Sequence, residues 1–175
     1  MWGPNSTGSP QEASAGLGYA VQAETVAKGE LSKVRLADAK NVSILGRSGQ
    51  VKLVAEHDAD IVGFSCGAPL QPTKHGFDSE LAAVYLRRDF QRAGLGRRLV
   101  GAVVEARRAQ AATGLLTWVI AGNRGARAFY EGLGGELIVE QPFQWDGMDL
   151  VEAGYVWRDL NVLVAACEAL ESTAR

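Results

Sequence analysis

The sequence contains few of the residues from which disulfide frameworks and metal sites are built. Its 175 residues include two cysteines and two histidines. Cys66 and Cys167 lie far apart in the chain, and no second cysteine pair accompanies them. We therefore predict neither a disulfide framework nor a metal site, and we expect both thiols to be small core or surface groups.

Long apolar runs and an excess of positive charge are also absent. No uninterrupted apolar stretch approaches the ~20 residues that a membrane-spanning helix needs. The start, Met1 to Pro4, has no basic segment leading into an apolar run, as a secretory signal would. The formal net charge of -2 argues against nucleic acid or an anionic membrane as the main partner. A cytoplasmic location is the resulting expectation.

What is present fits one globular domain preceded by an arm. The chain is 47% hydrophobic and 22% charged, in the ordinary range for a folded domain. Residues 1–19 are dominated by Gly, Ser, Pro, Asn and Ala, which bury too little apolar surface to offset the entropy of ordering. We predict a flexible N-terminal arm at 1–19 and a single domain at 20–175.

The first half of this domain shows helix, hairpin and loop patterns in turn. Between residues 22 and 40, apolar residues at roughly helical spacing predict one or two short helices. Two apolar, β-branched runs at 51–57 and 61–66 are joined by Asp58-Ala59-Asp60, which is typical of a β-hairpin. Prolines and a glycine then predict a loop at 69–76, and a strand is expected at 80–86.

The second half alternates helix and strand patterns. From Leu95 on, apolar residues recur on one helical face while most charged residues lie off it, which predicts a helix. A buried strand is expected at 115–121, and Asn123 is a good N-cap for a second helix that stops at Gly132. The periodicity further along predicts two strands separated by an Asp-Gly turn, and a closing helix, at 136–139, 151–157 and 160–170.

The segment Gln91-Arg92-Ala93-Gly94-Leu95-Gly96 joins the strand at 80–86 to the next helix. Glycines at such a junction let backbone N–H groups converge on an anion, and the helix N-terminus adds partial positive charge. Arg92, Arg97 and Arg98 could add charge-assisted contacts to phosphate oxygens. The segment therefore predicts a site for a phosphorylated cofactor, although a strand-to-helix turn without any ligand would use the same glycines.

Two other phosphate loops fit this segment poorly. The Walker A pattern needs a Gly-Lys-Ser/Thr ending, which Gly96-Arg97-Arg98 lacks. The dinucleotide fingerprint needs a third glycine where Leu99 stands. An arginine-rich nucleic-acid patch is also disfavoured, because the arginines coincide with the segment whose glycines predict a phosphate site.

Two motifs in this order resemble the GNAT superfamily of N-acetyltransferases. Gln91-x-x-Gly94-x-Gly96 is similar to its Gln/Arg-x-x-Gly-x-Gly/Ala motif, and the second match is Asn123-x-x-Ala126-x-x-Phe129-Tyr130-x-x-x-Gly134. The resemblance covers about residues 51–159. It implies an α/β (α+β) fold with a mixed, mainly antiparallel sheet of about six to seven strands flanked by helices. A parallel strand pair, at Glu80 and at Leu115, would splay at the cofactor site.

The resemblance implies acetyl-CoA as co-substrate and assigns its contacts residue by residue. The strand before the loop would pair with the pantetheine arm, and the loop would wrap the pyrophosphate. The implied cofactor-binding residues are Val84, Tyr85, Leu86, Gln91, Arg92, Ala93, Gly94, Leu95, Gly96, Arg97 and Asn123. The sequence departs from the commonest pattern at Arg87-Arg88-Asp89, where many members have a proline, and at Arg92, where glycine is frequent.

The resemblance also implies catalytic roles for Tyr130 and Glu80. Tyr130 matches the general acid that protonates the leaving thiolate, and Glu80 matches a base that some members use, directly or through water. Tyr130 could instead be an aromatic packing residue, and Glu80 a solvated charge at a strand end. His57 and His75 are expected at the surface, and His75 is the better outside candidate for a base.

These observations predict an N-acetyltransferase that moves acetyl from acetyl-CoA to a primary amine by direct attack in a ternary complex. The acceptor, a small molecule or a protein N-terminus, is not readable from the sequence. A non-catalytic acyl-CoA-sensing domain is the main alternative, and a peptide- or nucleic-acid-binding module leaves the second motif unexplained. The apolar closing helix and the strand around Tyr155 and Trp157 favour a homodimer.

Overall fold

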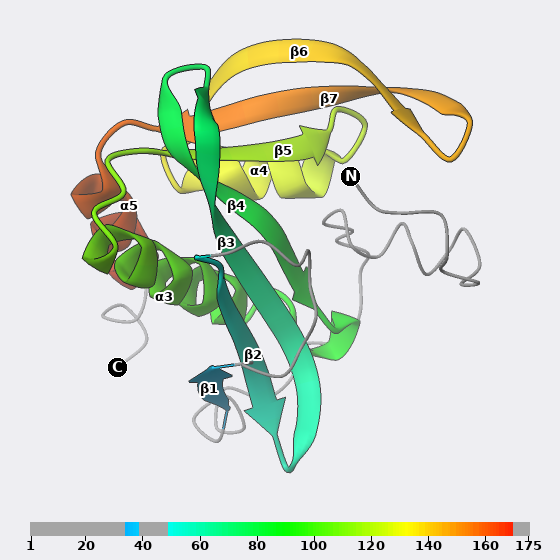
Figure 1. Cartoon of the computed structure of the whole chain (residues 1–175). Helices are drawn as coiled ribbons and strands as arrows, with labels where there is room; N and C mark the ends of the chain where they lie inside the picture. Colours follow the sequence, from blue (N-terminus) through cyan, green and yellow to red (C-terminus); the bar gives the residue numbers. More distant parts are fainter. Residues whose placement is uncertain (1–33, 39–48, 170–175) are drawn as a thin grey trace.

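The structure, a computed structural model, describes residues 34–38 and 49–169 (Figure 1). The predicted arm at 1–19 and most of the predicted helical segment at 22–40 lie outside these residues. Seven strands form one sheet in the order β1-β2-β3-β4-β5-β7-β6. The strands are β1 (Arg35–Asp38), β2 (Val51–His57), β3 (Asp60–Lys74), β4 (Phe77–Leu86), β5 (Leu115–Ile120), β6 (Glu136–Trp145) and β7 (Met148–Trp157). The helices are η2 (Arg88–Phe90), α3 (Leu95–Ala109), α4 (Arg124–Gly132) and α5 (Leu160–Glu168).

The sheet is mixed and mainly antiparallel, as predicted. β4 and β5 form a parallel pair, and the other neighbouring strands are antiparallel. Within the described residues β4 and β5 are in register only at Glu80↔Leu116. Beyond that pair the two strands diverge, as Figure 1 shows. The predicted splay between these strands is therefore present.

An irregularity in β4 lies beside this divergence. On the β3 side, Gly67 pairs with Leu81 and Cys66 pairs with Ala83, so Ala82 is an extra residue in β4. A bulge of this kind bends its strand and increases the local twist. The extra residue lies two positions after Glu80, the β4 residue that pairs with β5, which accounts for the divergence of the two strands.

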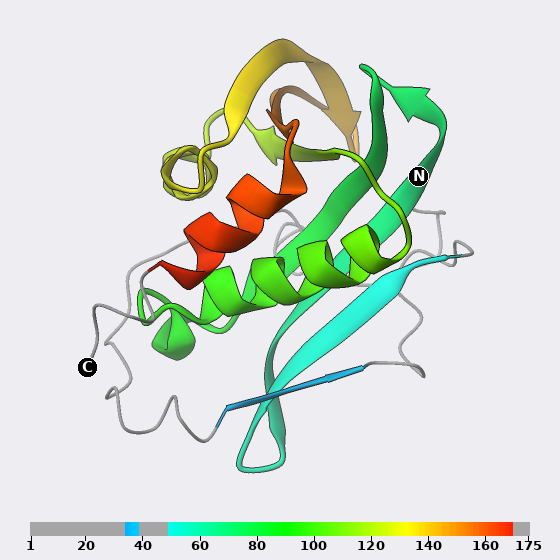
Figure 2. The ribbon, with the colours of Figure 1, turned by 90° about the vertical axis from the view of Figure 1, so that its left-hand side faces the viewer.

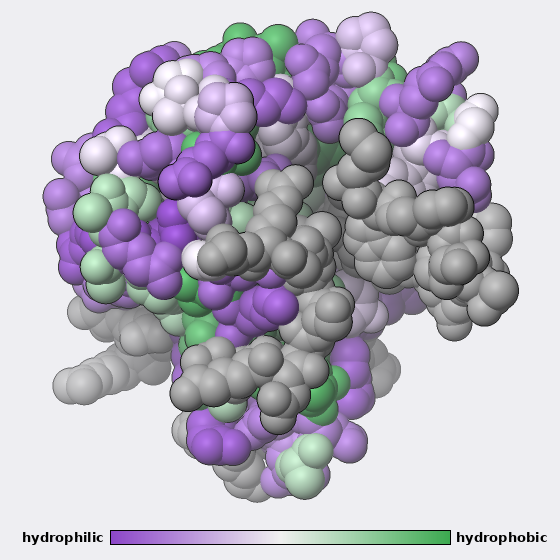
Figure 3. Space-filling view, viewed as in Figure 1, coloured by the Kyte–Doolittle hydropathy of each residue, from purple (hydrophilic) through white to green (hydrophobic). Residues whose placement is uncertain are grey.

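The apolar face of α3 packs on the sheet as its periodicity predicts. Leu95, Leu99, Val100, Val103 and Val104 are all buried. α3 and α5 lie side by side over the same face of the sheet (Figure 2). The surface of the described residues in Figure 3 is mostly hydrophilic, with smaller hydrophobic areas between. The same part of the chain contains no helix long and apolar enough to cross a membrane.

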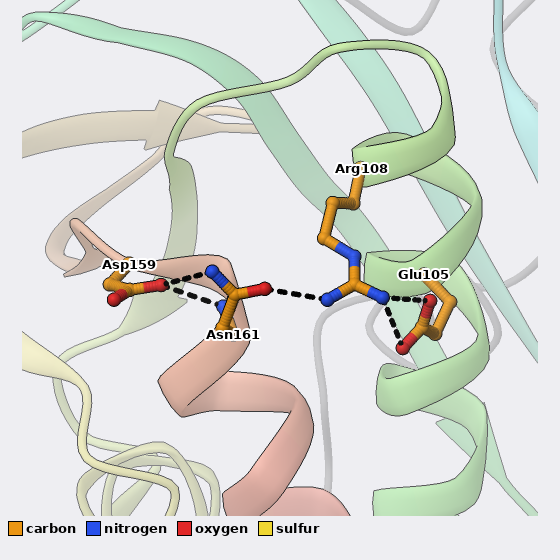
Figure 4. Close-up of polar contacts among 4 residues, drawn as sticks. All are labelled: Glu105, Arg108, Asp159 and Asn161. Atoms are coloured by element: carbon orange, nitrogen blue, oxygen red, sulfur yellow. Dashed lines mark hydrogen bonds and ion pairs between the residues drawn. The ribbon is translucent and has the colours of Figure 1, made fainter.

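Polar contacts fix α5 to α3 near both ends of α3. Arg108 donates to Asn161 Oδ1 at 2.6 Å and to Glu105 Oε2 at 2.8 Å, while Asp159 caps α5 through the Asn161 N–H (Figure 4). At the other end, Arg97 Nη1 donates to the Ala166 carbonyl at 3.0 Å. α5 is therefore anchored to the same helix that begins at the predicted cofactor loop.

Two sequence predictions are wrong in this region of the fold. Residues 35–38 are a strand rather than part of a helix, because they pair with β2 from Arg35↔Glu56 to Asp38↔Leu53. The loop predicted at 69–76 is strand as far as Lys74, with a turn only at His75-Gly76. β2 pairs with β3 only as far as Gly67. Beyond it β3 has β4 as its one described neighbour, and prolines are tolerated on such an edge.

The remaining elements follow their local signals. In the β2–β3 turn both central residues, Asp58 and Ala59, have positive φ, at 48° and 69°. The β6–β7 turn at Asp146-Gly147 has φ values of 47° and 76°. Positive φ at both central positions matches the twist of a two-residue hairpin. Both hairpins are therefore confirmed, with β6 and β7 longer than predicted.

The aromatic residues that favoured a homodimer lie in the chain's own core. Tyr155 is 0% exposed and Trp157 is 3% exposed. Trp157 Nε1 also donates to the Leu133 carbonyl at 2.9 Å. Packing within one chain explains the apolar character of β7, so these residues give no reason to expect a dimer. Both cysteines are likewise buried, and burial raises the pKa of Cys167 to about 11.

Replacing Asp78 with asparagine is expected to lower the free energy of unfolding by about 1–2 kcal/mol at neutral pH. The carboxylate accepts hydrogen bonds from Thr113 N, Thr113 Oγ1 and Gly114 N at 2.8 to 3.3 Å, tying β4 to the start of β5. Burial acts to raise the pKa of Asp78, but these bonds outweigh it and hold the pKa below its ordinary 3.8. The stabilisation is therefore complete above the unfolded-state pKa and is lost as pH falls through the folded-state pKa.

Urea unfolding of wild type and Asp78→Asn between pH 7 and pH 3 measures this effect. The two curves should converge at the acid end. Asp146→Asn at the exposed β6–β7 tip is the control, because Asn-Gly suits that turn. An equal loss of stability at every pH would contradict the assignment to the carboxylate charge.

Candidate active site

The predicted cofactor loop lies between the end of β4 and the first turn of α3. Gln91 Nε2 donates to the Leu86 carbonyl at 2.9 Å, so its side chain closes the loop against the strand. Gly94 is the N-cap of α3 with φ 90°. Among the described residues, the backbone N–H groups of 92–96 donate to no other backbone carbonyl. They have the character of a helix N-terminus ready for an anion.

The two glycines of the loop serve different purposes. A Cβ added at Gly94 would meet nothing within 4 Å, but the positive φ there is strained for any L side chain. At Gly96 a Cβ would lie 3.5 Å from the Phe129 ring, an ordinary contact. Gly94 thus fixes the backbone and leaves open space at the helix N-terminus, whereas Gly96 has room for a methyl group. Arg92 also has a positive φ, of 64°, which accounts for the frequent glycine at this position of the motif.

The arginines around the loop do not form one patch. Arg97 donates its N–H to the Gly94 carbonyl and its guanidinium to Ala166 of α5. Arg98 Nη2 donates to the Val34 carbonyl at 3.2 Å. Arg87 forms a two-pronged contact with Asp89, at 2.6 and 3.2 Å. Arg92 is exposed on the loop itself. The structure therefore places Arg92 at the loop surface and directs the Arg97 side chain to α5.

The predicted pantetheine strand has one backbone edge facing the splay. Its three residues pair with β3 on one side, from Val84↔Ser65 to Leu86↔Gly63. On the other side, β5 is in register no further than Glu80 within the described chain. The Tyr85 side chain stacks on Phe64, with ring centroids 5.7 Å apart. This leaves the β5-facing edge of Val84 to Leu86 in a position suited to pair with an extended ligand.

Tyr130 lies on α4 with its ring enclosed by aromatic neighbours. It is 6% exposed, and its ring centroid lies 5.4 Å from Phe129, 6.2 Å from Tyr155 and 5.9 Å from Trp157. Burial raises the pKa of Tyr130 above its ordinary value of 10.0, and the side chain of Thr117 acts in the opposite direction. The N-cap that starts α4 is confirmed, because Asn123 Oδ1 accepts from Ala126 N at 3.0 Å.

Glu80 lies at the start of the β4–β5 divergence, on the face of the sheet opposite to Tyr130. It is half-buried and pairs with Leu116, so its side chain lies on the Leu116 face of β5. Side chains alternate along a strand, and Thr117, with Tyr130 beside it, therefore lies on the opposite face. On the Glu80 face, β5 carries Leu116, Trp118 and Ile120, none of them ionisable. The predicted acid and base thus flank the β4–β5 gap from two sides.

The histidines are placed differently from each other. The prediction that His57 lies at the surface is wrong: its side chain is 13% exposed and its ring packs edge-on against Phe90, 5.2 Å away. His75 is exposed at the β3–β4 tip, where its ring lies 5.8 Å from Trp118. Among the described residues, neither ring is a neighbour of the Tyr130 ring.

Sequence reasoning missed Thr117. It is 2% exposed, and its hydroxyl donates to the Leu81 carbonyl at 2.9 Å across the gap. The available signal was a single hydroxyl within the otherwise apolar strand Leu115–Ile120. It also missed a network behind Tyr130, in which the Tyr155 hydroxyl donates to Glu131 at 2.6 Å and accepts from Arg127 at 3.0 Å.

Comparisons with known proteins agree with this arrangement. The family model described as acetyltransferase (GNAT) family matches residues 22–134. An uncharacterized N-acetyltransferase, YuaI of Bacillus subtilis (strain 168), is 31% identical over 113 residues, 65% of this chain and 65% of the relative. The chain thus spans slightly less than two thirds of that relative's length.

Solved structures share the fold. A ribosomal-protein-alanine N-acetyltransferase from Brucella melitensis is 28% identical with a TM-score of 0.55, over 64% of this chain and 70% of that one. A GNAT family acetyltransferase from Elizabethkingia anophelis with acetyl-CoA bound is 12% identical with a TM-score of 0.56, over 72% and 98%. With both motifs, the splayed strand pair and the family match in agreement, the chain belongs to the acetyltransferase (GNAT) family.

Proposed function

We propose that the chain is an acetyl-CoA-dependent N-acetyltransferase acting on a primary amine. The observation that carries this proposal is the junction of β4 and α3. At this junction the β5-facing edge of β4 is followed directly by the N-terminus of α3. The N–H groups of residues 92–96 there have no other backbone partner in the described chain. A pyrophosphate fits the N–H groups at the helix N-terminus, and an extended pantetheine arm fits the edge of β4.

The residues around the gap supply the remaining steps. The amine nitrogen attacks the thioester carbonyl carbon, and a backbone N–H of β4 stabilises the negative oxygen that develops. The C–S bond then breaks, and Tyr130 gives its phenolic proton to the departing sulfur. Glu80, directly or through water, takes the proton that the amine loses. In this scheme the thioester of acetyl-CoA lies beside Tyr130 in the β4–β5 gap, and the amine enters from the Glu80 face.

Two relatives guide the choice of ligands. The Elizabethkingia anophelis protein has acetyl-CoA bound, which supports acetyl-CoA as the donor to test first. The Brucella melitensis enzyme is named for the alanine of a ribosomal protein, which brings a protein amine forward as the first acceptor class to test. Small amines form the second class.

Calorimetric binding and a turnover assay test the proposal. Acetyl-CoA is titrated into the full chain, with adenosine as a control that lacks both pyrophosphate and pantetheine. Release of free thiol is then followed over peptides with N-terminal alanine and a panel of small amines. Binding together with thiol release is the expected result. Binding without thiol release over the whole panel would identify a sensing domain, and no binding would overturn both readings.

Replacing Glu80 with glutamine is expected to lower kcat/KM about tenfold at neutral pH, at the low end of base-catalysis effects. The loss should shrink as pH rises, because an acceptor amine that is already deprotonated needs no base. The pH dependence of kcat/KM for wild type and variant measures this. Glu105→Gln on the outer side of α3 is the matched control. A loss that is constant with pH would exclude Glu80 as the base.

A further inference from the structure

The indole of Trp118 lies on the Glu80 face of the sheet, the face from which the amine enters in the proposed reaction. Glu80 is level with Leu116 of β5, and Trp118 follows Leu116 by two residues, on the same face. A Cβ added at Gly154, the partner of Trp118 on β7, would lie 3.0 Å from the indole, too close for an ordinary contact. The glycine therefore lets the half-buried ring lie close to the backbone of β7.

The Trp118 ring already holds a cation from its own chain. Lys74, at the end of β3, places Nζ over the ring, 4.3 Å from its centroid. The His75 ring lies 5.8 Å from the same indole, so the β3–β4 tip lies over β5 (Figure 1). Among side chains, indole attracts an ammonium or a guanidinium most strongly. Because Lys74 is exposed, its contact with the ring is weak, and an arriving cation can replace it.

A carboxylate lies on each side of this ring. Glu80 is level with the β5 residue two positions before Trp118, and Glu152 pairs with Ile120, two positions after it. Gln141 Nε2 donates to Glu152 Oε1 at 2.6 Å, and within the described chain Glu152 forms no ion pair. An aromatic ring flanked by two carboxylates attracts positive charge.

We propose that Trp118 is a specificity-determining residue that binds a second cationic group of the acceptor while the reacting amine lies at Glu80. Two residues of a strand span about 7 Å, which sets the spacing between the two groups. Lys74 covers the ring until the second cation replaces it. The acceptor class is therefore a primary amine that also carries a guanidinium or ammonium group, whether a small molecule or the N-terminus of a basic peptide. This inference rests on the proposed acetyl transfer.

Two matched pairs of acceptors test the proposal. Agmatine is compared with 4-aminobutylurea, and alanyl-arginine amide with alanyl-citrulline amide. Each pair has the same primary amine and differs in the charge of a guanidinium. The KM of wild type for the charged member should be about fivefold lower than for the neutral one, with kcat within about twofold. Equal KM values in both pairs would overturn the proposal, and a preference within one pair alone supports it and identifies the source of the cation.

Substitution of the ring separates recognition of charge from packing. Trp118→Leu should raise the KM for the charged acceptor about fivefold and leave the KM for the neutral one unchanged. Trp118→Phe keeps an aromatic face and should give an intermediate value. Equal losses for charged and neutral acceptors in Trp118→Leu would overturn the proposal and leave Trp118 as a packing residue.

Removal of the internal cation gives a change in the opposite direction. Lys74→Gln should lower the KM for the charged acceptor about twofold, because nothing then competes for the ring. Arg35→Gln is the matched control, because this exposed arginine pairs with Glu56 and lies on β1, at the far edge of the sheet from β5. Its KM values should equal those of wild type. A higher KM for the charged acceptor in Lys74→Gln would contradict the competition.

A binding measurement without turnover keeps this inference apart from the proposed function. With coenzyme A, which has no acetyl group to transfer, agmatine should shift the indole N–H resonance of Trp118, assigned from Trp118→Phe, and 4-aminobutylurea should not. A resonance that agmatine leaves unmoved would overturn the cation site. A shifted resonance in a protein that releases no thiol from acetyl-CoA would overturn the proposed acetyl transfer, whereas thiol release with equal KM values would overturn this inference alone.

Discussion

Tyr130→Phe is expected to lower kcat about a hundredfold or more while the Kd for acetyl-CoA stays within about twofold. Phenylalanine keeps the ring among Phe129, Tyr155 and Trp157, so the core around α4 is preserved. What is lost is the one proton that Tyr130 can give to the leaving sulfur. Single-turnover kinetics with saturating acetyl-CoA, together with calorimetric binding, separate these two effects.

The pH dependence of kcat sharpens this expectation. Burial raises the pKa of Tyr130 above its ordinary 10.0, so the phenol stays protonated to higher pH than an exposed tyrosine. For a general acid the active form is the protonated one, and loss of activity on the alkaline side should therefore begin only above about pH 10. Below that, the wild-type rate should rise with pH as the acceptor amine loses its proton.

Ser65→Ala provides the control, because it removes a buried hydroxyl that donates to the Leu99 carbonyl at 3.3 Å and is absent from the Tyr130 cluster. Its kcat should remain close to wild type. A Tyr130→Phe enzyme with full kcat would remove the acid role and leave Tyr130 as a packing residue. A fall in the wild-type rate between pH 8 and 9 would assign the acid to another group.

The parts of the fold that could be predicted from the sequence carry their signal locally. The β2–β3 hairpin depends on Asp58-Ala59, whose residues adopt the turn themselves. The α4 boundary depends on Asn123, whose side-chain oxygen Oδ1 accepts from an N–H three residues away. Caps and turns of this kind depend on residues that are close in sequence, so a local sequence pattern is enough to locate them.

The parts that could not be predicted depend on partners far along the chain. Residues 35–38 carry an apolar spacing compatible with a helix, and only their pairing with β2 makes them a strand. In the site, the loop at 91–96 was predictable from its glycines. The Arg97 contact with α5 and the Thr117 contact with Leu81 join residues 69 and 36 positions apart, and no local pattern reports them.

Replacing Gly94 with alanine is expected to weaken acetyl-CoA binding about tenfold or more, whereas Gly96→Ala should change it less than about threefold. At Gly94, φ of 90° is strained for alanine, by about 1–3 kcal/mol, and the new methyl group enters the open space in front of the helix N-terminus. At Gly96 the methyl group would rest 3.5 Å from the Phe129 ring, inside the first turn of α3. Calorimetric titration of acetyl-CoA into both variants measures the difference.

The free energy of unfolding should fall in Gly94→Ala and rise in Gly96→Ala. This difference distinguishes backbone strain in the loop from steric crowding by the new methyl group. Gly96→Ala replaces a glycine within a helix and should raise the free energy of unfolding by up to about 1 kcal/mol. Gly94→Ala should lower it, because the strain is present with or without cofactor. Equal losses of affinity in both variants would mean that Gly94 has no special part in the loop. A Gly94→Ala protein that binds acetyl-CoA as tightly as wild type would place the pyrophosphate elsewhere.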